Sequence, residues 1–106
     1  MRHYEGVIIY DLAVEPQATQ AHLDKALEVI TSSGGSIDGI DRWGRRSFAY
    51  EVKHKREGYY VVVSFSTETE ALDALHRMLS LSDEVLRHKL IRIPDEVVAK
   101  RAAAVA

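Results

Sequence analysis

Hydrophobic residues follow a strand-like pattern in several segments of this chain. The run YYVVVSF is the strongest of them, because β-branched and aromatic residues favour extended backbone. A glycine, Gly44, interrupts the longest segment, and Pro94 closes the last one. The charged stretch from Lys53 to Gly58 is expected to be a turn. The predicted strands span residues 3–11, 36–52, 59–65 and 85–93.

Apolar residues at every third or fourth position predict two helices between these strands. The first starts at Pro16, which suits a first helical turn, and stops at SSGG, residues 32–35, where glycine can take the left-handed conformation. The second is expected to start at Thr67, which forms a capping-box signature with Glu70. The apolar stripes consist of Leu23, Ala26, Leu27 and Ile30 in the first helix and of Leu72, Leu75 and Leu79 in the second.

The order of the predicted elements is β-α-β-β-α-β. This order predicts an α+β fold, a ferredoxin-like sandwich in which one four-stranded antiparallel sheet carries both helices on one face. Residues 1–93 are expected to form the domain. Residues 94–106 are alanine-rich without a clear apolar period, so this tail is expected to be flexible, as a frayed helix or a disordered end, or bound to a partner.

Alternation along YYVVVSF assigns its side chains to the two faces of the sheet. Tyr59, Val61, Val63 and Phe65 are expected under the helices, with the residues between them on the open face. The same fold includes the RNA-recognition motif, whose third strand carries base-stacking aromatic residues. Aligned on the glycine of EGYYVVVS, this chain has Val61 and Ser64 in place of those aromatics. The sequence therefore predicts that a stacking platform is missing.

Composition narrows the possible functions. With 106 residues, 46% hydrophobic and 28% charged, the chain suits one soluble globular domain. It has no cysteine, which excludes disulfides, thiolate nucleophiles and cysteine-based zinc sites. Its histidines show no ligand spacing, so no metal site is expected, and no phosphate loop or serine nucleophile motif is present. No run is long enough for a membrane span or a signal peptide, so we expect a cytoplasmic protein without cofactors.

The positive charge of this mildly acidic chain is concentrated in one stretch. Residues 42–56 hold six of the fourteen Lys and Arg against one acid, Glu51, so they carry +5 and the rest of the chain carries −7. Each predicted helix region is net −2. We therefore expect an acidic helix side and a partly basic sheet side, and such segregation lets an acidic protein present a phosphate-binding face. The plain alternative is a solvated charged hairpin.

The segment WGRRSFAYEVKHKREGYYVV, at residues 43–62, adds a family signature. Together with MRxYE at the start and VLRH at residues 85–88, it resembles the bacterial small-subunit ribosomal protein six family at matching order and spacing. The match covers most of the chain up to Pro94. One departure is Gly6, where members usually carry a larger apolar residue, so a neighbouring side chain must fill that space.

The resemblance implies a protein without catalytic activity in the small ribosomal subunit. It implies binding to the central domain of the small-subunit ribosomal RNA together with small-subunit ribosomal protein eighteen, and we expect a monomer when the chain is isolated. The RNA contacts that the resemblance implies are Arg2, Arg45, Arg46, Lys53, Lys55, Arg56 and Arg87. The candidate partner contacts are Trp43, Tyr60, Lys100 and Arg101.

Three other functions remain open at this point. A small ferredoxin-like enzyme, such as an acylphosphatase, needs a glycine-rich loop after the first strand, and residues 11–14 are DLAV instead. A dimeric α+β-barrel oxygenase would bury the open sheet face, which the charged hairpin argues against. A self-associating ligand-sensing domain is the third possibility. Each arginine could also be an ordinary surface residue paired with Asp38, Asp41 or Glu57.

Overall fold

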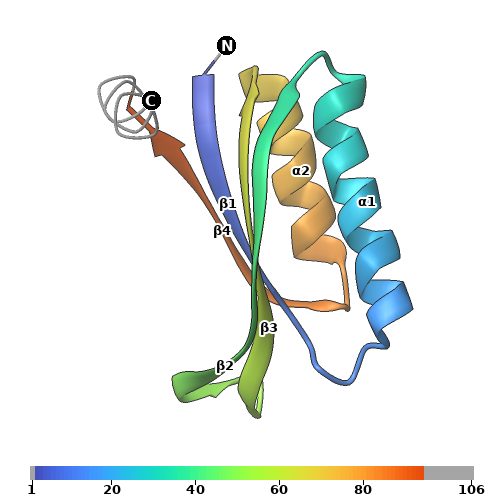
Figure 1. Ribbon diagram of the computed structural model, residues 1–106, viewed down its shortest axis with the longest axis vertical. Helices are drawn as coiled ribbons and strands as arrows, with labels where there is room; N and C mark the ends of the chain where they lie inside the picture. The colour runs from blue at the N-terminus through green and yellow to red at the C-terminus, as the bar shows by residue number, and fades with distance from the viewer. Residues whose placement is uncertain (1, 95–106) are drawn as a thin grey trace.

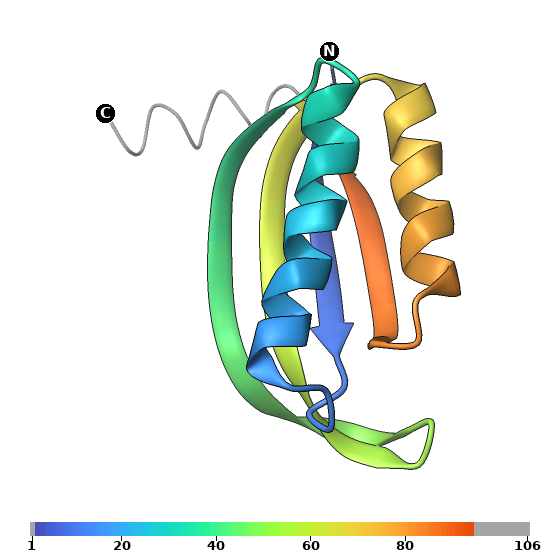
Figure 2. The ribbon, with the colours of Figure 1, turned by 90° about the vertical axis from the view of Figure 1, so that its right-hand side faces the viewer.

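The computed structural model describes residues 2–94 and confirms the ferredoxin-like fold. One four-stranded antiparallel sheet has the strand order β2-β3-β1-β4, and both helices cover the same face of it (Figures 1 and 2). The elements are β1 (Arg2–Tyr10), α1 (Pro16–Ser32), β2 (Ser36–Val52), β3 (Lys55–Thr67), α2 (Thr69–Leu81) and β4 (Val85–Ile93). The tail after Pro94 lies outside the described residues.

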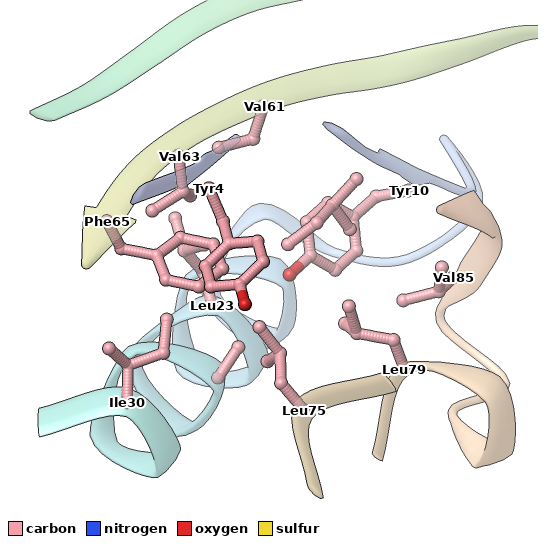
Figure 3. Packing of buried hydrophobic residues seen from close by; sticks show 12 residues of the cluster. Tyr4, Tyr10, Leu23, Ile30, Val61, Val63, Phe65, Leu75, Leu79 and Val85 are labelled. Atoms are coloured by element: carbon pink, nitrogen blue, oxygen red, sulfur yellow. The ribbon is translucent and has the colours of Figure 1, made fainter. Parts of the chain in front are cut away.

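The core lies between the helices and the sheet, and β3 crosses it as the alternation predicts. Val61, Val63 and Phe65 are buried under the helices, and Tyr59 packs against the same cluster. Both predicted apolar stripes of the helices contribute to this core, and Leu23 and Leu75 face the sheet (Figure 3). Burial of such side chains is the main stabilising term of the fold.

The space over Gly6 in β1 is filled as expected. A methyl group on Gly6 would lie 3.0 Å from a Leu90 side-chain atom and 3.5 Å from the Phe65 ring. These two neighbours from β4 and β3 therefore occupy the volume of the missing side chain.

The start of α2 differs from the prediction. Thr67 is the last residue of β3 and pairs with Arg2, so it belongs to the sheet and cannot cap the helix. Helix α2 starts at Thr69, and its N-cap residue, Glu68, makes no side-chain capping hydrogen bond. The capping-box prediction is wrong because strand pairing extends through the threonine. The end of α1 is as predicted: Gly34 has a positive φ of 89°, and the Gly35 amide donates to the Ile30 carbonyl at 3.0 Å.

The turn between β2 and β3 is shorter than predicted. Only Lys53 and His54 form it, both with positive φ (51° and 63°), which is the geometry of a two-residue type I′ hairpin turn. Val52 pairs with Lys55, so the basic residues after the turn belong to β3. The two strands run beyond the helices and bend there (Figure 2).

A chain of buried and partly buried hydrogen bonds joins β1, α1 and the end of α2, and no motif in the sequence predicts it. The hydroxyl of Tyr10 lies 2.8 Å from Nδ1 of His22, and Nε2 of His22 lies 2.7 Å from Oγ of Ser82. Ser82 donates to the Met78 carbonyl at 2.6 Å. Since Ser82 uses its proton there, it accepts from Nε2–H. In the neutral ring, which burial favours, Nδ1 then accepts from the Tyr10 hydroxyl. Burial lowers the pKa of His22, while the Glu84 carboxylate opposes this shift.

Candidate nucleic-acid interface

Three aromatic side chains gather on the helix-free face at the hairpin end of the sheet. Trp43 and Tyr60 stack with ring centres 6.3 Å apart and planes 9° apart, and Phe48 lies 6.1 Å from Tyr60 on the other side. Trp43 is 47% exposed. This group differs from the stacking platform of the RNA-recognition motif: Val61 is buried under the helices, and two of the three aromatic residues come from β2, which the β3 motif does not cover.

A bulge in β2 explains how these residues reach one face. The pairing with β3 shifts between Arg42 and Gly44, where Gly44 has a φ of 79°, which non-glycine residues rarely adopt. From Gly39 to Trp43, odd-numbered residues face away from the helices, and from Gly44 to Phe48 even-numbered residues do. Trp43 and Arg46 therefore share the open face although their positions differ by three.

Two arginines flank the aromatic group. The Arg46 guanidinium lies 5.3 Å from the centre of the Trp43 ring, a cation–π contact. Arg87 in β4 lines a groove of about 180 Å³ together with Phe48 and Tyr60. Among residues 2–94, neither arginine has a carboxylate partner within salt-bridge distance. Both charges are therefore available to an outside anion.

Arg45 points the other way. It pairs with Tyr59, whose side chain packs on the helix side, whereas Arg46 pairs with Gly58. Glu57 accepts two hydrogen bonds from Arg45, one from Nε at 2.8 Å and one from Nη2. The two adjacent arginines thus lie on opposite faces of the hairpin, and the charge of Arg45 is partly neutralised.

Two other predicted contacts are also in ion pairs. Nζ of Lys55 lies 3.8 Å from Asp11, and Nε of Arg56 lies 3.6 Å from Glu51. Glu51 is the single acid of the basic stretch. Exposed pairs of this kind contribute about 0–1 kcal/mol, so an RNA phosphate can displace the carboxylates.

The remaining predicted residues lie apart from this group. Lys53 is exposed in the hairpin turn. Arg2 starts β1 at the opposite end of the sheet (Figure 1). Lys100 and Arg101 lie outside the described residues. The structure thus brings together Trp43, Tyr60, Arg46 and Arg87, and it adds Phe48 and Lys89, which the sequence analysis did not select.

Charge divides the open face along the strands. Lys89 pairs with Val7 and lies on this face next to Arg87, so the half near the hairpin carries three positive side chains. Asp41 is an acidic residue in the same half, and its carboxylate accepts a 3.0 Å hydrogen bond from the Trp43 indole. The other half carries Glu5 and Asp38. The positive field is therefore concentrated where the aromatic rings are.

Residues 2–94 contain no helix long and apolar enough to cross a membrane. In the same part of the chain, no three His, Cys, Asp or Glu side chains come together as metal ligands.

Comparison with known proteins gives the family. The model of the ribosomal protein S6 family matches residues 3–92. The chain belongs to this family. The small ribosomal subunit protein bS6 of Micrococcus luteus is 46% identical over 96 residues, which cover 91% of this chain and 94% of that protein. The bS6 protein of Carboxydothermus hydrogenoformans is 41% identical over 92 residues, which cover 87% and 96%.

A comparison with solved structures also finds the S6 fold. The crystal structure of 30S ribosomal protein S6 from Thermotoga maritima has a TM-score of 0.86 at 29% identity, with 97% of each chain covered. The C-terminal domain of the MgtC protein from Mycobacterium tuberculosis, at 15% identity and a TM-score of 0.59, shares the fold alone.

Membership of the S6 family confirms several predictions made from the sequence. The family consists of non-enzymatic structural proteins of the small ribosomal subunit, so the prediction that the chain is not an enzyme is confirmed. The predicted place, in the small ribosomal subunit of the cytoplasm, is confirmed by the same relatives. The acylphosphatase, oxygenase and ligand-sensing alternatives are set aside.

Proposed function

We propose that this chain binds the central domain of the small-subunit ribosomal RNA jointly with small-subunit ribosomal protein eighteen. The open face at the hairpin end makes the contact. One observation carries the proposal: Arg46 and Arg87 flank the Trp43–Tyr60 stack on the helix-free face and have no carboxylate partner among residues 2–94. Unpaired guanidinium groups beside exposed aromatic rings suit RNA, because arginine binds phosphate in a bidentate manner and rings stack on unpaired bases.

The predicted RNA contacts then fall into three groups. Arg46, Arg87 and Lys53 bind phosphate directly, since none of them has a carboxylate partner in the part of the chain that the structure describes. Arg45, Lys55 and Arg56 must exchange their acidic partners for phosphate and contribute less. Arg2, at the far end of the sheet, contacts RNA only if the RNA follows the length of β1.

The partner protein docks at the exposed edge of the aromatic group. Trp43 and Tyr60 offer apolar surface on the hairpin, and a basic partner there would extend the positive surface around Arg46. The helix side would repel RNA, because Asp24, Glu28 and Asp73 are exposed on it. The isolated chain, as a monomer, should therefore bind RNA weakly, and the heterodimer strongly. Lys100 and Arg101 of the tail stay candidate partner contacts.

A salt titration tests the proposal. The heterodimer carrying Arg46→Ala and Arg87→Ala is titrated with central-domain RNA at several salt concentrations, beside the wild type. If each arginine holds one phosphate, the slope of log affinity against log salt should become shallower by roughly 0.7 to 0.9 for each residue removed.

The matched control is Arg77→Ala, which removes the same side chain from the exposed surface of α2. Its slope should equal that of the wild type. Equal slopes for the double variant and the wild type would mean that the open face is only a solvated surface. A larger loss for Arg45→Ala than for Arg46→Ala would place the RNA on the opposite face.

A further inference from the structure

Two histidines from different elements meet on the surface away from the hairpin. Nε2 of His88 in β4 lies 3.0 Å from Nδ1 of His76 in α2, with ring centres 4.9 Å apart and planes at 62°. His88 is half-buried, and His76 is exposed. The two histidines are twelve residues apart in the sequence, which is not a spacing typical of metal-ligand motifs.

Nε2 of His88 and Nδ1 of His76 share one proton in this hydrogen bond. At least one of the rings must be neutral, since a hydrogen bond between two imidazole nitrogens needs one donor and one lone pair. A divalent metal ion that replaces the shared proton can bind both of these nitrogens, and the displaced proton moves to the far nitrogen of the same ring.

The distance selects the class of metal. Bonds from histidine nitrogen to a divalent metal are about 2.0–2.1 Å long, so two nitrogens 3.0 Å apart enclose an angle of about 90° at a shared ion. Neighbouring positions at right angles occur in tetragonal Cu²⁺ and Ni²⁺ complexes, whereas a tetrahedral Zn²⁺ ion would require the two rings to move slightly apart. Imidazole also suits Cu²⁺ and Ni²⁺ as a ligand type.

We propose that His76 and His88 form a two-histidine surface site for a tetragonal divalent metal ion, Cu²⁺ or Ni²⁺, with water in the remaining positions. Within residues 2–94 no third histidine or carboxylate joins them, so those positions stay open. The ion bridges α2 to the edge strand β4. Because the site exists only in the folded chain, metal binding stabilises the fold.

The test is a Cu²⁺ titration followed by calorimetry and electron paramagnetic resonance. All proteins carry His3→Gln, so that this histidine of β1 does not compete for Cu²⁺. The parent protein should bind one Cu²⁺ with a two-imidazole spectrum and gain thermal stability. His76→Gln and His88→Gln should each weaken binding by about tenfold or more, since even the loss of a supporting group around a metal ligand costs 10–100-fold.

The matched control is His54→Gln, which removes a single exposed histidine from the hairpin turn and should leave affinity and spectrum unchanged. His76 is exposed, so its variant tests the site even if His88→Gln folds poorly. Equal affinity in His76→Gln and His54→Gln, or a spectrum with one nitrogen ligand in the parent, would overturn the proposal.

Discussion

Replacing Tyr10 by phenylalanine should destabilise the fold although it removes one oxygen atom. Tyr10 is fully buried, and its hydroxyl donates to Nδ1 of His22 at 2.8 Å. The other nitrogen of His22 is fixed by Ser82, so the ring cannot turn to find a new donor without breaking that bond. Tyr10→Phe therefore leaves a buried acceptor without a partner.

The expected loss is about 1–3 kcal/mol in the free energy of unfolding, the usual cost of an unsatisfied buried polar group. In a domain of this size, each kcal/mol lowers Tm by about 4–8 °C. Urea and thermal unfolding at neutral pH, followed by circular dichroism, measure both quantities.

The control is Tyr50→Phe, which removes the same atom from a side chain that is 72% exposed. It should change stability by less than about 0.5 kcal/mol. A Tyr10→Phe protein as stable as the Tyr50→Phe protein would refute the reasoning, because the buried hydrogen-bond chain would then contribute nothing.

Three further results are expected. Because the pKa of His22 is lowered in the folded chain, the unfolded chain takes up a proton at this residue below about pH 6.5 while the folded chain does not. The contribution of His22 to stability is therefore complete above that pH and falls as the pH drops. His22→Gln should flatten this part of a curve of stability against pH. A methyl group on Gly58 would lie 2.5 Å from an Ile9 carbon, so Gly58→Ala should cost about 1–3 kcal/mol in urea unfolding, whereas Gly39→Ala, with open space around it, should cost less than about 1 kcal/mol. Leu75→Ala should cost about 2–5 kcal/mol in the same assay, because its side chain is buried between α2 and the sheet.

Periodicity was enough to predict the element order and the core. Along β3 the alternation of Val61, Val63 and Phe65 with their neighbours identified the buried face, because strand geometry alone sets it. The same rule implied that the adjacent Arg45 and Arg46 point to opposite faces, a signal that was present in the sequence and not used.

Other features depend on pairing between distant segments. The bulge at Gly44 reverses the alternation and brings Trp43 to the side of Arg46, and the size of such a shift is set by the register with β3. Thr67 has a capping sequence, yet strand pairing with Arg2 outweighs it. The bond between Tyr10 and His22 exists only once α1 packs on β1.

The most direct test of the account asks which face of the protein lies on RNA. Because the chain has no cysteine, a single one can be introduced to carry an iron chelate that cleaves nearby RNA. Asp41→Cys places it on the open face beside Trp43, and Ala74→Cys places it on the exposed surface of α2. In a complex with protein eighteen and central-domain RNA, the account predicts strong, localised cleavage from position 41 and little from position 74. Stronger cleavage from position 74, or equal cleavage from both, would contradict it.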